Sequence, residues 1–299
     1  MKKLTTWYLI LAISFFAGSI VFVNPVSASG PIHWGYEGAE GPEFWGELSP
    51  DFALCSTGQE QTPIDVPATA PANPADITFN YQPTALTIFN NGHTVQVNYD
   101  AGSSIDVGGK TYQLKQFHFH TPSEHTMNGQ STDLELHLVH QSADNQLAVV
   151  GVMLKQGSEN PAYAPVFNNL PVQESEPSAV SGVTINAADL LPAERTYYRY
   201  NGSLTTPPCS EGVQWLLLNT PVELSSAQVS AFQAIFVHNA RPVQPLNGRS
   251  FLQTSALTPA TSAPVALPTT GGVPLPLESV VFGLGLLTTL TGLYFLRRK

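Results

Sequence analysis

Gln116-Phe117-His118-Phe119-His120 alternates polar and aromatic residues, as a β-strand with one apolar face does. Successive side chains of a strand point to opposite faces, so His118 and His120 share one face. The run Leu134-Glu135-Leu136-His137-Leu138-Val139-His140 alternates in the same way and contains a third histidine. If these two strands are neighbours in a sheet, His118, His120 and His137 converge on one point.

Three neutral imidazoles with an open fourth position are typical of a catalytic zinc site, whereas structural zinc sites have four protein ligands. The alternative is that these histidines are ordinary polar residues on a half-exposed strand. A His-x-His pair by itself does not decide between the two interpretations, so the rest of the chain has to be considered.

Composition restricts the class of partner. The 299-residue chain has 12 Lys and Arg against 22 Asp and Glu, a formal charge of −10. Nucleic-acid binding needs basic patches, so we expect no nucleic-acid partner. The acidity suits a soluble, exported surface, and the length of residues 29–253 suits one domain with a large core and no internal repeats.

The N-terminus has the pattern of a secretory signal peptide. Lys2 and Lys3 precede an apolar run over 7–23, and Val26-Ser27-Ala28 is a small-x-small cleavage site. We therefore predict a signal peptide over residues 1–28. The alternative is an uncleaved anchor helix, because the apolar run is long for a signal.

The hydrophobic pattern predicts a mainly β (α+β) domain. The apolar run Val149–Leu154 does not alternate and predicts a central strand buried on both faces. Residues 225–237 predict a helix, residues 31–60 an extended arm, and the Pro/Thr/Ala/Ser segment 254–266 a linker. Strands are expected near 86–90, 94–99, 113–119, 134–140, 148–154 and 213–218.

Several motifs occur in one order across residues 31–253: His33-Trp34-Gly35-Tyr36, Gln61-Thr62-Pro63-Ile64-Asp65, Asn91-Gly92-His93, the FHFH run, Ser123-Glu124-His125-Thr126, ELHLVH, Tyr200 to Cys209, and Arg241 to Leu246. In this set the chain resembles the alpha-class carbonic anhydrases. The resemblance implies one large, twisted, mostly antiparallel sheet of about ten strands with a few peripheral helices. It also implies a zinc enzyme that interconverts CO2 and bicarbonate.

The resemblance assigns roles to individual residues. Zn2+ would be held by His118, His120 and His137, which would be oriented by Gln116, by Glu135 and by the backbone carbonyl of Asn239. Thr205 would orient the attacking hydroxide by accepting a hydrogen bond from it while donating its own hydrogen bond to Glu124, and His93 would be the proton shuttle. The substrate pocket would be lined by Thr206, Val139, Val149, Leu204, Val213 and Trp215.

Two other functions remain open at this point. One is a catalytically silent surface binding protein that keeps the fold. The other is a zinc scavenger or structural-zinc protein, which is disfavoured because no fourth protein ligand is evident. The chain differs from the family at Gln96, where Asn is common. In the family this position helps to place the chain of water molecules that leads to the proton shuttle. The sequence predicts no particular oligomeric state.

The two cysteines, Cys55 and Cys209, are an even pair in a chain that we expect to be exported, which favours a disulfide. The alternative is two free buried thiols. By the resemblance, a bridge here would clamp the segment that holds Thr205 and Thr206.

The C-terminus has a second targeting pattern over residues 267–299. Leu267-Pro268-Thr269-Thr270-Gly271 resembles the LPxTG sorting motif of Gram-positive surface proteins and is followed by an apolar segment, 279–296, and the basic tail Arg297-Arg298-Lys299. By this resemblance a sortase would cut after Thr270 and attach the chain to the cell wall. The alternative is a membrane anchor, since this segment of 18 residues is just long enough to span a bilayer.

Overall fold

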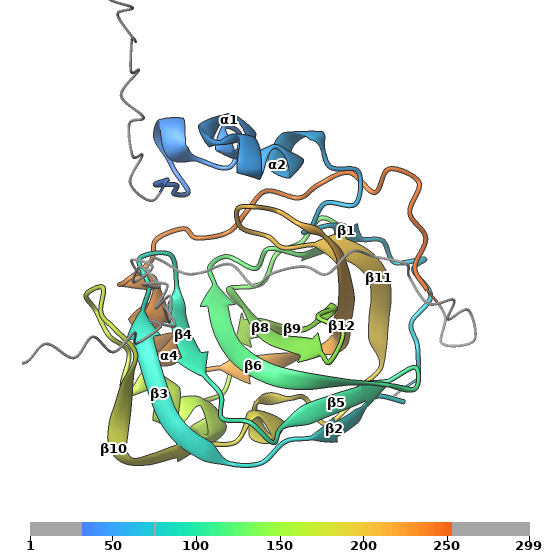
Figure 1. The fold of residues 1–299 in the computed structure, drawn as a ribbon. Helices are drawn as coiled ribbons and strands as arrows, with labels where there is room; N and C mark the ends of the chain where they lie inside the picture. Colours follow the sequence, from blue (N-terminus) through green and yellow to red (C-terminus); the bar gives the residue numbers. More distant parts are fainter. Residues whose placement is uncertain (1–31, 75, 253–299) are drawn as a thin grey trace, which may run out of the picture. The chain divides into compact units, whose positions relative to one another are not determined.

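The computed structural model describes residues 32–74 and 76–252, and ten of their strands form one sheet (Figure 1). Eight strands follow one another across it in the order β10 (Ser178–Ile185), β3 (Thr84–Asn90), β4 (Val95–Asn98), β6 (Lys110–His120), β8 (Leu134–Ser142), β9 (Leu147–Gln156), β12 (Glu211–Leu224) and β11 (Tyr197–Ser203). The other two are β5 (Ser104–Val107), which pairs with β6, and β2 (Thr78–Asn80), which pairs with β5.

The remaining elements are short. A two-stranded parallel sheet joins β1 (Asp65–Val66) to β7 (Thr126–Met127). The α-helices are α1 (Trp45–Leu48), α2 (Leu54–Thr57), α3 (Ala164–Phe167) and α4 (Ser226–Gln233), and the 3-10 helices are η1 (Gly38–Glu40), η2 (Pro50–Phe52), η3 (Pro161–Tyr163) and η4 (Ala187–Leu190). The predicted ten-stranded sheet with few helices is confirmed, and within it only β9 and β12 run parallel among the described pairs.

The central strands are buried on both faces, as the unbroken apolar run predicts. In β9 the first eight residues are buried, and the strand lies between β8 and β12. Leu136 and Leu138 of β8 point into the larger apolar cluster, whereas Val139 packs with Trp215 on the opposite face. The sheet therefore separates two apolar layers, and the histidines of β8 lie within it.

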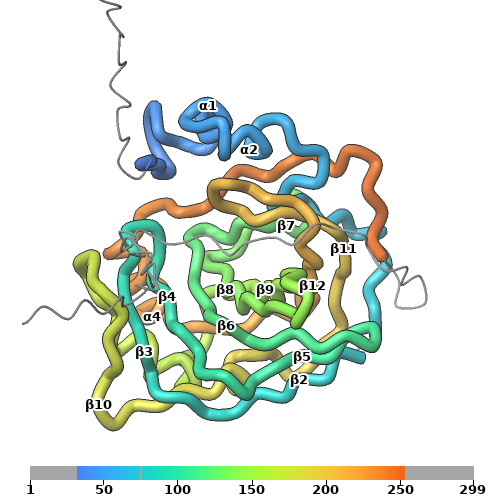
Figure 2. Tube along the Cα trace, viewed as in Figure 1, coloured from blue at the N-terminus to red at the C-terminus, as the bar shows by residue number. Residues whose placement is uncertain are grey.

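The pairing of β6 with β8 sets the geometry of the histidines. The two strands are antiparallel, and His118 lies directly opposite His137 in the register. Figure 2 traces β6 beside β8 and β9 in the middle of the sheet. The three histidines lie on strands that each have a neighbouring strand on both sides. The backbone that carries them is therefore held rigidly.

Two expected elements differ from the structure. Helix α4 ends at Gln233 instead of residue 237, because the chain turns away and the Asn239 N–H donates to the Thr121 carbonyl (2.9 Å). Ser225 caps this helix, forming a reciprocal box with Gln228. The expected extended arm over 31–60 contains four one-turn helices, which are too short to leave a periodic pattern.

The disulfide is confirmed and the segments at both ends are not described. Cys55 and Cys209 are bonded and pack with Trp45. In the described part of the chain no helix is long and apolar enough to cross a bilayer. The predicted signal peptide, linker, sorting signal and alternative membrane anchor over 279–296 all lie outside the described residues.

Candidate functional site

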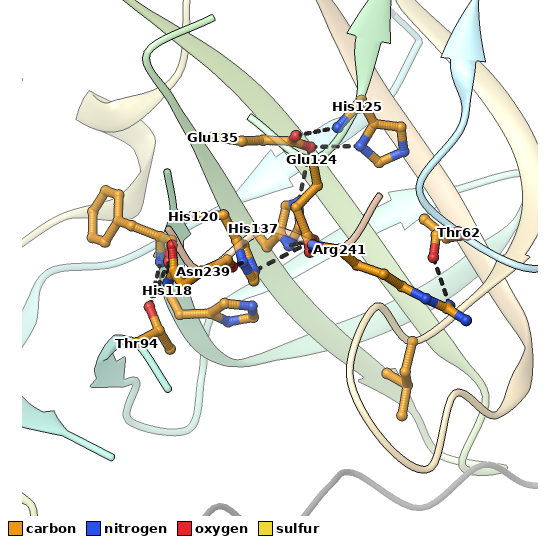
Figure 3. A network of polar contacts seen from close by, with 12 residues as sticks. Thr62, Thr94, His118, His120, Glu124, His125, Glu135, His137, Asn239 and Arg241 are labelled. Atoms are coloured by element: carbon orange, nitrogen blue, oxygen red, sulfur yellow. Dashed lines mark hydrogen bonds and ion pairs between the residues drawn. The ribbon is translucent and has the colours of Figure 1, made fainter. Parts of the chain in front are cut away.

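His118 and His120 from β6 and His137 from β8 converge (Figure 3). One ring nitrogen of each lies within 4.8 Å of the other two. The ring centroids are 5.0 Å apart for His118 and His120, 5.3 Å for His118 and His137, and 4.6 Å for His120 and His137. The structure therefore brings together the three residues that the strand alternation places on one face.

The second ring nitrogen of each histidine donates to a fixed acceptor. These bonds run from His118 Nδ1 to Gln116 Oε1 (2.8 Å), from His120 Nδ1 to the Asn239 carbonyl (2.7 Å), and from His137 Nε2 to Glu135 Oε1 (2.8 Å). An acceptor on one nitrogen keeps the proton there and leaves the lone pair on the other nitrogen. The nitrogens that carry a free lone pair are thus His118 Nε2, His120 Nε2 and His137 Nδ1. These three lone pairs are free to bind a common partner.

These three imidazoles are held in the neutral form. Burial lowers the pKa of His118 and His137 and brings the pKa of His120 to about 4. His120 Nε2 is buried and has no hydrogen-bond partner, which is costly unless something binds it. Three neutral nitrogen donors, one of them otherwise unpartnered, fit a zinc ion with three protein ligands.

Glu124 lies beside His120 and His137. Its Oε2 is 3.5 Å from His120 Nε2 and 3.8 Å from His137 Nδ1, and its Oε1 accepts the Arg241 N–H (2.9 Å). Burial raises the pKa of Glu124 to about 7, against the lowering effect of His137. A side-chain hydrogen bond with Thr205 also lowers this pKa and is the smallest of these effects. Glu124 Oε2 has no hydrogen-bond partner of standard geometry, so the role of Thr205 as donor to Glu124 stays a prediction.

A cavity of about 40 Å³ opens beside His118 and His137. Its remaining lining is Gln116, Val139, Val149, Leu204, Thr205, Thr206 and Trp215. A cavity needs about 10–15 Å³ of free space measured in this way to hold one water molecule, so this space suits a ligand of a few heavy atoms. Val213, which was expected in the wall, is fully buried in the same apolar cluster as the wall residues but does not itself line the cavity.

His93 is placed apart from this cluster. Its ring stacks on Trp34 with centroids 3.7 Å apart and 7° between planes, and it is half-buried. Burial lowers the pKa of His93 to about 4, and His33 contributes in the same direction. The Asn239 side chain donates to the His93 carbonyl (3.0 Å) and so links this loop to the backbone that orients His120.

Arg241 is a buried residue to which the sequence assigned no role. Its guanidinium donates to Gln61 Oε1 (2.8 Å), to the Thr62 carbonyl (2.8 Å) and to the Cys55 carbonyl (2.9 Å). In Figure 1 the segment that carries it (orange) runs between α1–α2 and the sheet. Its motif was visible in the sequence, but no local pattern indicates that a cation would tie the disulfide segment to Glu124.

His125 is a second such residue. It accepts or donates at both ring nitrogens, to Glu135 Oε1 (2.7 Å) and to the Tyr200 hydroxyl (2.5 Å). These partners come from β8 and β11, so only the tertiary structure reveals the contact.

Comparison with known proteins agrees with this geometry. A family model described as eukaryotic-type carbonic anhydrase matches residues 40–255. A protein of Nostoc sp. (strain PCC 7120) named carbonic anhydrase is 47% identical over 230 residues, covering 74% of this chain and 86% of its own length. A solved alpha-carbonic anhydrase of Thermovibrio ammonificans, in complex with sulfanilamide, is 44% identical with a TM-score of 0.71, covering 74% of this chain and 99% of its own.

A relative of another name has the same fold. A solved dioscorin in complex with ascorbate is 33% identical, with a TM-score of 0.68, and covers 73% of this chain and 96% of its own.

Proposed function

Because the chain belongs to the eukaryotic-type (alpha) carbonic anhydrases, which are enzymes, we propose that it catalyses the reversible hydration of CO2 with one zinc ion held by His118, His120 and His137. The observation that carries this proposal is the convergence of three imidazole nitrogens whose partner nitrogens each donate to a fixed acceptor. When bound, zinc would supply a Lewis acid that lowers the pKa of a water molecule to about 7, as is general for carbonic anhydrases.

The protein's part is to hold the donor set neutral and correctly oriented. Neutral imidazoles leave the charge of the metal undiminished, whereas thiolates or carboxylates would reduce it. Burial lowers the pKa of all three histidines, and their acceptors prevent the rings from turning.

Thr205 and Glu124 would orient the attacking water. Thr205 lines the cavity, and a side-chain hydrogen bond from it lowers the pKa of Glu124. When the Thr205 hydroxyl donates its hydrogen to the Glu124 carboxylate, its oxygen lone pairs are left facing the water. The water then donates to Thr205 and directs its own lone pair at the substrate carbon.

The substrate site is the apolar side of the cavity. CO2 is small and has no net dipole, so Val139, Val149, Leu204 and Trp215 suit it better than polar groups would. Thr206 is a polar residue on the same cavity, where it can contact bicarbonate. Val213 packs in the same apolar cluster as these wall residues.

His93 would carry the proton to solvent. A group with a pKa of about 4 is a weak proton acceptor at neutral pH, so the ring has to leave Trp34 to serve as a shuttle. We propose that the stacked ring is a resting position of the shuttle.

The second candidate function is that of a catalytically silent surface binding protein. The dioscorin relative is the observation that favours it. Loss of turnover would be expected to accompany loss of the metal donors. Here all three histidines and their three acceptors are in place, which supports the enzyme.

The cellular setting is a proposal from sequence alone. We propose that residues 1–28 direct export, that residues 29–253 form the catalytic domain, and that residues 254–266 lead to the sorting signal 267–299. Attachment to the cell wall by a sortase would place the activity at the cell surface. Anchoring by residues 279–296 is the alternative.

The loss of 18O from labelled bicarbonate tests the reaction itself, because each hydration–dehydration cycle exchanges oxygen with water. We expect the full-length chain with zinc to deplete the label far faster than buffer, and His120→Ala to do so at the buffer rate. Exchange at the buffer rate by the zinc-loaded wild type would leave the binding protein as the function.

A further inference from the structure

Glu135 is a fully buried carboxylate that serves two histidines. Its Oε1 accepts His137 Nε2 (2.8 Å) and His125 Nδ1 (2.7 Å), and its Oε2 accepts the His125 backbone N–H (2.8 Å). His125 therefore supplies two of the three hydrogen bonds that hold this carboxylate (Figure 3). A buried charge with fewer donors would be free to turn away from His137.

Tyr200 determines which nitrogen of His125 carries the proton. Its hydroxyl lies 2.5 Å from His125 Nε2 and 3.4 Å from Thr62 Oγ1, so the shorter contact receives the proton. Thr62 Oγ1 already accepts the Ser203 N–H (2.9 Å). With Tyr200 donating to Nε2, the ring N–H of His125 is at Nδ1 and faces Glu135.

The sheet leaves room for this chain of contacts at two glycines. Gly151 pairs with His137 in the register, and a Cβ there would lie 2.7 Å from Leu217 Cδ1 and 3.2 Å from Glu135 Oε1. A Cβ on Gly202 would lie 2.2 Å from Thr62 Oγ1 and 2.9 Å from the Tyr200 ring. Both glycines are therefore needed for the close approach of the groups around Glu135 and Tyr200.

We propose that Tyr200 and His125 are positioning residues for the metal centre: acting through Glu135, they keep the proton of His137 on Nε2 and leave Nδ1 free to bind the metal. This inference rests on the proposed function, since it concerns the same three ligands. Neither residue touches the cavity where substrate would bind.

The fold contains a matched control for this pair. Tyr81 and His140 are also buried, with the Tyr81 hydroxyl 2.8 Å from His140 Nε2. His140 lies on the same strand as His137, and its Nδ1 donates to the Ala148 carbonyl (3.3 Å). Removing the Tyr81 hydroxyl disturbs an equally buried tyrosine–histidine pair that has no bond to Glu135.

The test is the zinc affinity of the full-length chain, measured by competition with a chromogenic chelator. Partners of metal ligands typically contribute 10–100-fold to metal affinity, so we expect Tyr200→Phe to weaken zinc binding about tenfold. Tyr81→Phe should leave the zinc affinity unchanged, although it should lower the unfolding temperature about as much as Tyr200→Phe does. His125→Asn, whose amide can donate in place of Nδ1, should retain more affinity than His125→Leu.

Histidine side-chain 15N spectra of the metal-free chain give a second readout. Wild type and Tyr81→Phe should show His137 protonated at Nε2 alone, and Tyr200→Phe should show a mixture of tautomers. Equal zinc affinity and an unchanged tautomer in Tyr200→Phe would overturn the inference. A wild type that binds zinc without hydrating CO2 would refute the proposed function instead. The comparison of zinc affinities would then still decide whether Tyr200 and His125 position the metal ligand.

Discussion

Glu124 and Glu135 are two buried carboxylates beside the same histidines, and their surroundings move their pKa values in opposite directions. Burial raises the pKa of both. At Glu135 the contacts with His125 and His137 outweigh burial and hold the pKa well below its usual range. At Glu124 burial prevails and the pKa is raised to about 7. One carboxylate therefore stays charged and orients a ligand, while the other can exchange a proton near neutral pH.

This difference predicts how Glu124→Gln affects the metal-free protein. Below pH 4.5 the carboxyl is protonated in folded and unfolded states alike, and Gln resembles it. Between pH 4.5 and about 7 the unfolded chain releases its proton first, so rising pH destabilises only the wild type. The stability advantage of Glu124→Gln should grow by about 1.4 kcal/mol per pH unit over that window. Urea unfolding of both proteins at pH 5, 6 and 7 measures it, and a pH-independent difference would contradict the assigned pKa.

Trp34→Leu should raise the pKa of His93. Stacking on the indole buries the imidazole and lowers its pKa to about 4, and His33 is the smaller cause. Removing the indole should return the pKa toward 6.5, whereas His33→Gln should produce a smaller rise. An NMR titration of His93 measures both. A wild-type pKa already near 6.5 would show that the ring does not rest on Trp34.

At the scale of elements, alternation was sufficient to place β6 and β8 and the shared face of His118 and His120, because period-2 patterns report a strand directly. The unbroken apolar run likewise predicted β9. The register that sets His118 opposite His137 could only be assumed, since it depends on pairing between strands. The helices of residues 38–57 are too short to leave a periodic pattern. The role of His125 leaves no local signal, because its partners Glu135 and Tyr200 lie on β8 and β11.

Gly151→Ala tests how closely β9 approaches the site. The new methyl would meet Leu217 and the Glu135 carboxylate, so we expect a loss of about 1–3 kcal/mol in unfolding free energy together with weaker zinc binding. Gly35→Ala is the control, because a Cβ there meets nothing within 4 Å. Equal stability and zinc affinity in the two variants would mean that the sheet does not limit Glu135.

At the scale of the whole molecule, the disulfide joins parts of the chain that are 154 residues apart. The Cys55 carbonyl accepts a hydrogen bond from Arg241, and the Cys209 carbonyl accepts one from Gln61, which is itself a partner of Arg241. Loop entropy for a closure of this length gives about 5 kcal/mol, and removal of native disulfides typically costs 2–5 kcal/mol. The double variant Cys55→Ala/Cys209→Ala should therefore unfold at clearly lower urea concentration. An unchanged midpoint would show that the packing around Trp45 holds these segments without the bond.

The strand pattern predicted the main strands and, once β6 and β8 are taken as neighbours, the convergence of the three histidines. The ten-stranded sheet was predicted from the resemblance, and the disulfide from an even pair of cysteines in a chain that we expect to be exported. The sequence did not predict that Val213 does not line the cavity. That outcome depends on side-chain packing, which residue types alone do not determine.

The measurement that tests the central claim most directly is the rate of CO2 hydration by stopped flow while zinc is titrated into the metal-free full-length chain. We predict that the rate rises linearly and stops at one zinc per chain. His140→Ala, which alters the neighbouring histidine on the other face of β8, should behave the same way, and His120→Ala should show no rise. Fast hydration by the metal-free chain or by His120→Ala, or one bound zinc without hydration, would contradict the account.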